Sequence, residues 1–214
     1  LPTSILDIQE KIKVIAEERK MWRIEANERV VKFEKDKKKF LADSKKSNYD
    51  DYLYAAGIQK KFLKVQAKED GRSLFVTGSF GVGKTYHAVS VMKSYIDNLP
   101  DTCFVKPFSK LPIFITVPEL LLKIRSVFSL QKCEDEIVDK YANSPLLVLD
   151  DLGAEQATDF AMRTLYIILN RRDGDMLQTI ITSNLTLDEV KERLGDRIAS
   201  RIAGMSHVIK IAGK

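Results

Sequence analysis

The residues with the clearest chemistry lie in the stretch GSFGVGKT, which occupies residues 78–85. Gly78, Gly83, Lys84 and Thr85 fit the spacing G-x-x-x-x-G-K-[ST] of a phosphate-binding loop. Glycines let the backbone turn tightly and bring its N–H groups onto phosphate oxygens, while lysine neutralises phosphate charge and threonine ligates Mg²⁺. We therefore predict a nucleoside triphosphate site. Its predicted contact residues are Gly78, Ser79, Phe80, Gly81, Val82, Gly83, Lys84, Thr85 and Tyr86.

Two carboxylates follow an apolar run further along the chain. Residues 146–149 are all Leu or Val, and Asp150 and Asp151 come directly after them. We expect this run to be a buried strand next to the phosphate-loop strand, with Asp150 at its carboxyl end, where ligands bind in open α/β sheets. Asp150 is the candidate carboxylate for Mg²⁺, and Asp151 is the candidate to polarise the attacking water. The alternatives are a helix cap or turn residue for Asp150 and a non-catalytic Asp151, because aspartate is one methylene shorter than glutamate.

A third polar strand end is predicted at Asn184, which closes the stretch TIITSN. There it would lie between the phosphate loop and Asp150, close to the γ-phosphate. An amide in that place can orient water and sense whether the γ-phosphate is present. The alternative is an ordinary turn asparagine after a strand.

Two arginines near the end of the chain, Arg197 and Arg201, are four residues apart in GDRIASRIAG and so share one face of a helix. One interpretation is solvated surface or an internal ion pair. The other is that one of them reaches into the ATP site of a neighbouring subunit, where an arginine stabilises transition-state charge.

Short apolar runs alternate with helical patterns from residue 73 onward, which predicts a parallel sheet covered by helices on both faces. The predicted strands are residues 73–77, 113–117, 146–150, 179–183 and 207–211. The predicted helices are residues 84–97, 118–128, 133–142, 159–172 and 187–203.

The first part of the chain has a different composition. Residues 4–46 contain no glycine or proline, and apolar residues recur there mostly at steps of three and four. This pattern predicts a long helix or a helical hairpin with one apolar face. The basic run 32–46 is either a solvated helix end or a contact for nucleic acid or an acidic partner. We expect a partner-binding segment at 1–50, a linker and helix at 51–72 and an ATPase core at 73–214.

The bulk composition fits one α/β domain with an appendage. The chain has 214 residues, a formal net charge of +5 and a pI of about 9.0, which suits anionic partners without requiring them. Cys103 and Cys133 lie far apart without a metal-ligand pattern, and we expect two free thiols in a reducing cytosol. No apolar run is long enough to span a membrane and no signal peptide is visible, so we expect a cytoplasmic protein.

Four stretches, GSFGVGKT, LLVLDDLGAE, TIITSNLTLDE and LGDRIASRIAG, follow one another within residues 73–211. In this order they resemble the AAA+ ATPases, and within those the bacterial and phage replicative helicase loaders of the DnaC and DnaI type, with IstB transposition ATPases as relatives. The resemblance implies a five-stranded parallel sheet with the phosphate-loop strand beside strand 179–183. It makes Lys84 and Thr85 the Walker A pair.

The resemblance also implies roles for the other site residues. Asp150 and Asp151 would form the Walker B pair, and Asn184 would be sensor 1. Arg201 would be the arginine finger, with Arg197 beside it as a second candidate. In the resembled family the site that these residues form binds ATP or ADP together with Mg²⁺.

Members of this family bind ATP, contact single-stranded DNA and use an N-terminal region to grip the replicative hexameric helicase. By resemblance this chain would do the same, as a homo-oligomer or assembled on the helicase, with weak or assembly-dependent ATP hydrolysis. The resemblance also implies the cytoplasm of a bacterial cell, with the protein encoded by the host or a phage. One alternative is a transposition helper ATPase acting on double-stranded DNA. Another is a small-molecule kinase, which Asn184 and the arginine pair fit less well, because they suit ATP held between subunits.

Overall fold

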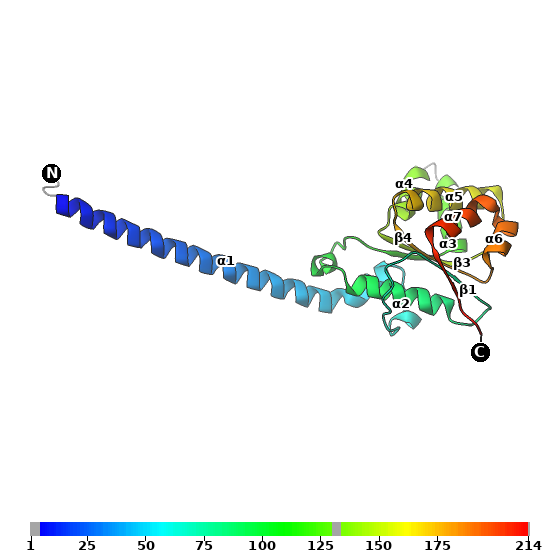
Figure 1. Ribbon diagram of the computed structural model, residues 1–214, viewed down its shortest axis with the longest axis horizontal. Helices are drawn as coiled ribbons and strands as arrows, with labels where there is room; N and C mark the ends of the chain where they lie inside the picture. The colour runs from blue at the N-terminus through cyan, green and yellow to red at the C-terminus, as the bar shows by residue number, and fades with distance from the viewer. Residues whose placement is uncertain (1–4, 130–133, 214) are drawn as a thin grey trace. The chain divides into compact units, whose positions relative to one another are not determined.

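The computed structural model describes residues 5–129 and 134–213 (Figure 1), and the chain divides into two compact units, Leu1–Ser47 and Asn48–Lys214. Cys103 is a buried free thiol, whereas Cys133 lies outside the described residues. Among the described residues, no helix combines the length and the apolar character that crossing a bilayer requires.

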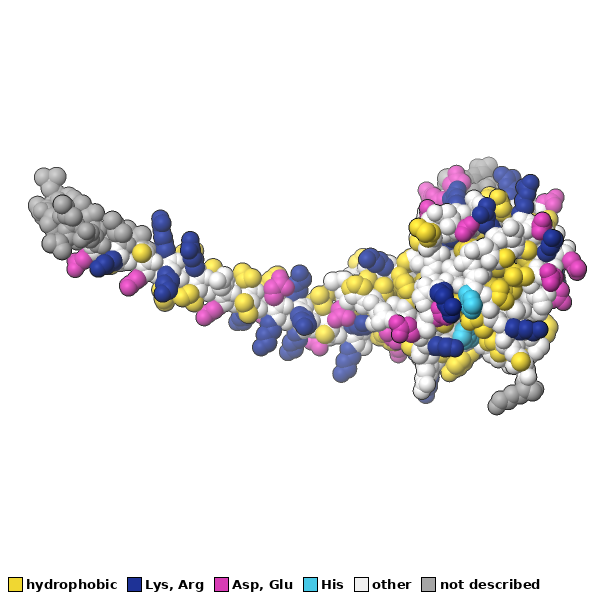
Figure 2. Space-filling view, in the orientation of Figure 1, with side chains coloured by type: hydrophobic (Ala, Val, Ile, Leu, Met, Phe, Trp, Pro, Cys, Tyr) yellow, Lys and Arg dark blue, Asp and Glu magenta, His cyan; other side chains and the backbone are white. Residues whose placement is uncertain are grey.

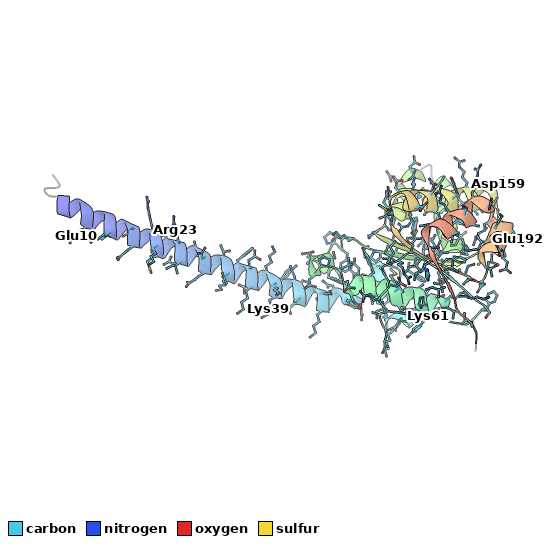
Figure 3. The ribbon with its side chains drawn as sticks, viewed as in Figure 1. Glu10, Arg23, Lys39, Lys61, Asp159 and Glu192 are labelled. Atoms are coloured by element: carbon cyan, nitrogen blue, oxygen red, sulfur yellow. The ribbon has the colours of Figure 1, made fainter. Side chains whose placement is uncertain are left out.

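The first unit consists of helix α1 (Ile5–Ala55) up to Ser47. Of the two predicted forms the structure has the single long helix, because no glycine or proline interrupts residues 4–46. Its described surface carries charged side chains, among them Glu10, Arg23 and Lys39 (Figure 3), with apolar ones between them (Figure 2). The apolar side chains that are more than half exposed are Val14, Met21, Trp22, Val30, Val31, Phe33 and Phe40.

The second unit is built on a parallel five-stranded sheet. Its strands are β1 (Leu74–Thr77), β2 (Ile113–Thr116), β3 (Leu146–Leu152), β4 (Gln178–Ser183) and β5 (His207–Lys210). Their order is β2-β3-β4-β1-β5, with every neighbouring pair parallel, which confirms the predicted fold class. The strand β1 lies beside β4, as the resemblance implied. The expectation that β3 is next to the phosphate-loop strand is wrong, because β4 separates β3 from β1.

One or two α-helices follow each of the first four strands. They are α2 (Lys84–Asp97), α3 (Val117–Ser129), α4 (Glu134–Ala142), α5 (Asp159–Gly174), α6 (Leu187–Leu194) and α7 (Asp196–Met205), with short 3₁₀ turns at Lys60–Phe62 and Asp101–Phe104. The predicted helix 187–203 is two helices rather than one. Gly195 has φ of 93° between them, a left-handed conformation that glycine adopts without strain and that ends α6.

Two apolar clusters cover the two faces of the sheet. Helix α2 packs on one face together with the last residues of α1, whereas α3, α5 and α7 pack on the other face (Figure 1). Residues 51–72, expected as linker and helix, supply the fully buried Tyr52 and Leu53 to the first cluster. Since parallel strands buried on both faces carry apolar side chains throughout, the polar side chains gather where the strands end. The carboxyl ends of β1, β4 and β3 therefore form the edge that holds the site.

Candidate nucleotide-binding site

The phosphate loop connects the end of β1 to the start of α2. Gly78 has φ of 154°, and a Cβ atom there would lie 2.3 Å from the carbonyl oxygen of Ile211, so only glycine fits this turn. Gly83 is the N-cap of α2 and provides no side-chain hydrogen bond to the helix. The first N–H groups of α2 therefore keep their capacity to bind an anion, and the helix dipole favours one. Phe80 and Tyr86 are more than half exposed beside the loop.

The side chain of Lys84 lies back over the loop that it follows. Its Nζ donates to the carbonyl oxygens of Gly78 at 2.8 Å and Ser79 at 2.7 Å, and to Oδ1 of Asn184 at 2.6 Å. Burial lowers the pKa of Lys84, while the charges of Asp151 and Asp150 act in the opposite direction. A buried ammonium group is thus held where a phosphate bound to the loop would need it.

Asp150 is buried at the end of β3 and accepts two hydroxyl hydrogen bonds. Thr85 Oγ1 donates to Oδ2 at 3.2 Å, and Thr182 Oγ1 donates to Oδ1 at 2.7 Å. Burial raises the pKa of Asp150, and the bonds from Thr182 and Thr85 partly offset this. A hydroxyl and a carboxylate this close together are the oxygen donors that suit Mg²⁺, which takes few protein ligands and completes its shell with phosphate and water.

Asp151 and Asn184 complete the polar edge. Asp151 has φ of 62°, within an irregularity of the β3–β4 pairing between Leu149 and Leu152. Its N–H donates to Thr182 Oγ1 at 2.9 Å, and Asn184 Nδ2 donates to its Oδ1 at 3.0 Å. The side-chain amide of Asn184 therefore links Lys84 to Asp151, because its oxygen accepts from Lys84 and its nitrogen donates to Asp151.

Thr182 and Glu155 have places in this region that the sequence analysis did not predict. The Thr182 hydroxyl joins the two aspartates by donating to Asp150 and accepting from Asp151 N–H. The available signal was weak, because Thr179 and Ser183 of the same strand also carry hydroxyls. Glu155 is buried, and its Oε2 accepts from Gly153 N–H at 2.9 Å. Burial raises the pKa of Glu155.

The two arginines lie apart from this polar edge, on α7. Arg201 Nη1 donates to Asp173 Oδ2 of α5 at 2.7 Å, whereas the side chain of Arg197 is exposed. Among the described residues, neither arginine donates a hydrogen bond to Asp150, Asp151 or Asn184. In one subunit the structure thus brings together the loop, the aspartates and Asn184, and leaves both arginines outside.

This strand order, with a phosphate loop after β1 and polar residues after β3 and β4, defines an AAA+ protein of the phosphate-loop nucleotide-binding class. A family model described as "IstB-like ATP binding protein" matches residues 5–214, and the chain belongs to that family.

Curated and solved relatives are similar to the chain over its core. The replicative helicase loader DnaI of Bacillus subtilis is 28% identical over 122 residues, covering 56% of this chain and 36% of the relative. A crystal structure of the DnaC helicase loader has a TM-score of 0.59 at 24% identity, covering 72% of this chain and 99% of that one. A crystal structure of DnaI has a TM-score of 0.55 at 25% identity, covering 75% and 83%. The chain thus spans about a third of the length of the curated DnaI loader that it matches.

Proposed function

We propose that this chain is an ATP-dependent loader that binds a replicative hexameric DNA helicase and helps place it on single-stranded DNA. The observation that carries the proposal is the path Lys84–Asn184–Asp151. Asn184 is hydrogen-bonded to both Lys84 and Asp151. A phosphate that draws Lys84 away from Asn184 therefore also changes the hydrogen bonding of Asp151. In this way the presence of nucleotide at the loop can alter the ends of β3 and β4.

The site residues have distinct tasks in this proposal. Lys84 and the N–H groups at the start of α2 would hold the phosphates, and Thr85 and Asp150 would hold Mg²⁺. Mg²⁺ bound there would supply neutralisation of phosphate charge. Asp151 and Asn184 orient the attacking water, with Asp151 accepting its hydrogen bond.

Hydrolysis in this proposal depends on assembly. Arg201, with Arg197 as the second candidate, approaches the ATP of a neighbouring subunit, either in a homo-oligomer or on the helicase. An arginine at the γ-phosphate accelerates hydrolysis by several orders of magnitude in related phosphoryl-transfer enzymes. Within one subunit Arg201 is instead paired with Asp173, which supports a role for it in a neighbour's site. A single subunit should accordingly hydrolyse ATP slowly.

The proposed helicase contact is α1 in the first unit. Trp22 and Phe33 are 76% and 65% exposed there, between basic side chains. Aromatic residues are enriched at protein interfaces relative to the rest of a protein surface. The names of the relatives support a loader in the bacterial cytoplasm, where replicative helicases act.

A loading assay tests the proposal. Bacterial replicative helicases are mixed with closed circular single-stranded DNA, and the helicase that co-elutes with the circle is measured with and without this chain and ATP. We expect the chain to increase the bound helicase only with ATP, and the Lys84→Ala variant to lose that increase. Binding to a transposase and to double-stranded DNA instead would support the transposition alternative, and ATP-dependent phosphorylation of a metabolite would exclude both.

A further inference from the structure

We propose that Asp173 is a positioning residue that holds Arg201 within its own subunit and so restrains the action of Arg201 on a neighbour's ATP. This inference rests on the proposed role of Arg201 as the arginine finger. The experiments below separate a failure of that role from a failure of the restraint.

The geometry is a direct ion pair between two helices. Asp173 lies in the last turn of α5, and its Oδ2 accepts from Arg201 Nη1 of α7 at 2.7 Å. Hydrogen bonds to Asp173 and then to Tyr166 raise the pKa of Arg201. The Nη1 group, one of the guanidinium donors that would bind a phosphate, is therefore engaged within the subunit.

Helix stability does not explain the carboxylate of Asp173. The carboxyl end of a helix carries partial negative charge, and an aspartate in the last turn is unfavourable there. The favourable charges of that turn are Arg171 and Arg172, which precede Asp173. The contact that compensates Asp173 is thus the one with Arg201.

The pair is exposed enough to be exchanged for another anion. The side chains of Arg201 and Asp173 are 39% and 29% exposed, and ion pairs of this kind are weak in water. A phosphate presented by an adjoining subunit can replace the carboxylate, because the guanidinium binds both anions with the same donors. The strength of the Asp173 contact then sets the protein concentration at which subunits associate closely enough for Arg201 to leave Asp173.

The test compares Asp173→Asn with the matched control Asp175→Asn. Both remove one carboxylate from the same segment, but Asp175 is exposed and has no ion pair among the described residues. Phosphate release is measured against protein concentration. We expect Asp173→Asn to lower the concentration for half-maximal hydrolysis roughly two- to five-fold, because an exposed pair is worth no more than that. ATP affinity should not change, Asp175→Asn should behave as wild type, and Asp173→Glu should restore the restraint.

The double variant Asp173→Asn with Arg201→Ala should match Arg201→Ala alone, because the restraint acts only through Arg201. Hydrolysis unchanged or lowered by Asp173→Asn, while Arg201→Ala still abolishes it, overturns the restraint alone. Wild-type hydrolysis in Arg201→Ala overturns the finger role instead, and the restraint with it. Where hydrolysis is too slow to measure, ATP-dependent self-association by sedimentation velocity gives the same comparison with the same expected shift.

Discussion

Lys84 and Asp150 are both buried charged residues, and their burial sets the behaviour of the nucleotide site at the scale of single residues. Lys84 donates to carbonyl oxygens of the loop, and Asp150 accepts from hydroxyls of α2 and β4. Such a site holds its charged groups at the loop before the ligand arrives, and in the proposed function binding exchanges the bond from Lys84 to Asn184 for one to a phosphate oxygen. The same burial shifts both pKa values toward the neutral forms.

The Lys84→Ala variant should lose nucleotide binding. It removes the only side chain that hydrogen-bonds both the loop and Asn184 among the described residues, and a buried charge-assisted contact of this kind is worth about 3 kcal/mol or more, a loss of about 100-fold in affinity. Anisotropy of a fluorescent ATP analogue measures it. Arg201→Ala is the control and should bind ATP normally; retained full affinity in Lys84→Ala would refute the phosphate-loop assignment.

The Asp150→Asn variant should separate metal binding from folding. Because burial raises the pKa of Asp150, the folded state binds a proton more readily than the unfolded state does. The contribution of Asp150 to the free energy of unfolding is therefore full at low pH, and it falls as the pH rises through the raised pKa of the folded state. Asn, which is neutral and of the same shape, should stabilise the nucleotide-free protein at pH 7 by on the order of 1 kcal/mol.

In the same Asp150→Asn protein, Mg²⁺ should no longer strengthen ATP binding. In the wild type that strengthening should weaken on acidification at a higher pH than an exposed aspartate would give, since protonated Asp150 cannot ligate the metal. Urea unfolding and ATP titrations with and without Mg²⁺, each across pH, measure both effects. An unchanged Mg²⁺ dependence would show that Asp150 is not a metal ligand.

At the scale of elements, Arg172 joins α4, α5 and β4. It is fully buried, and its guanidinium donates to the carbonyl oxygens of Tyr141, Ser144 and Gln178 at 3.1, 2.7 and 2.6 Å and to Thr179 Oγ1 at 2.8 Å. Burial lowers the pKa of Arg172 to about 10, so it stays charged at neutral pH. The end of α4 and the start of β4, the strand that leads to Asn184, are thus fixed by one side chain.

Arg172→Lys should destabilise the protein by about 2–4 kcal/mol, because lysine cannot reach these acceptors from one planar fork and leaves buried carbonyls unpaired. The matched control is Arg171→Lys at the adjoining position, where the side chain is part-exposed and pairs with Asp139, and the expected change is within about 0.5 kcal/mol. Urea unfolding of both variants and the wild type measures the two changes in the free energy of unfolding. Equal effects at both positions would mean that the Arg172 network contributes little.

At the scale of the whole molecule, the two units divide the proposed work. Residues Asn48–Lys214 contain the sheet and every residue of the nucleotide site, whereas the unit Leu1–Ser47 carries exposed apolar and basic side chains on one helix. Partner binding and ATP binding should therefore be separable by substitution.

The Phe33→Glu variant should bind ATP normally and lose helicase binding by about ten-fold or more, as expected for an exposed aromatic anchor. Leu122→Glu is the matched control, because Leu122 is an apolar residue of the second unit with the same exposure of 65%. Pull-down with a replicative helicase measures the first property and ATP titration the second. Helicase binding that survives Phe33→Glu but not Leu122→Glu would place the contact on the second unit.

The sequence by itself determined the strands and most helix bounds, and it pointed to the phosphate loop, the two aspartates and Asn184 as candidates for the nucleotide site. These features depend on local patterns: apolar runs bounded by turns, and polar residues at strand ends. The single helix at the start of the chain also follows from the absence of glycine and proline over residues 4–46.

Only the tertiary structure decided which residues meet across the chain. Nothing local distinguishes Arg171 from Arg172, yet one is part-exposed and the other is buried. Strand order likewise placed β4 between β1 and β3, which brings the Thr182 hydroxyl between the two aspartates. The pairing of Arg201 with Asp173 depends on how α7 packs against α5. Contacts between residues distant in sequence are set by packing of the whole core, which no short window of sequence contains.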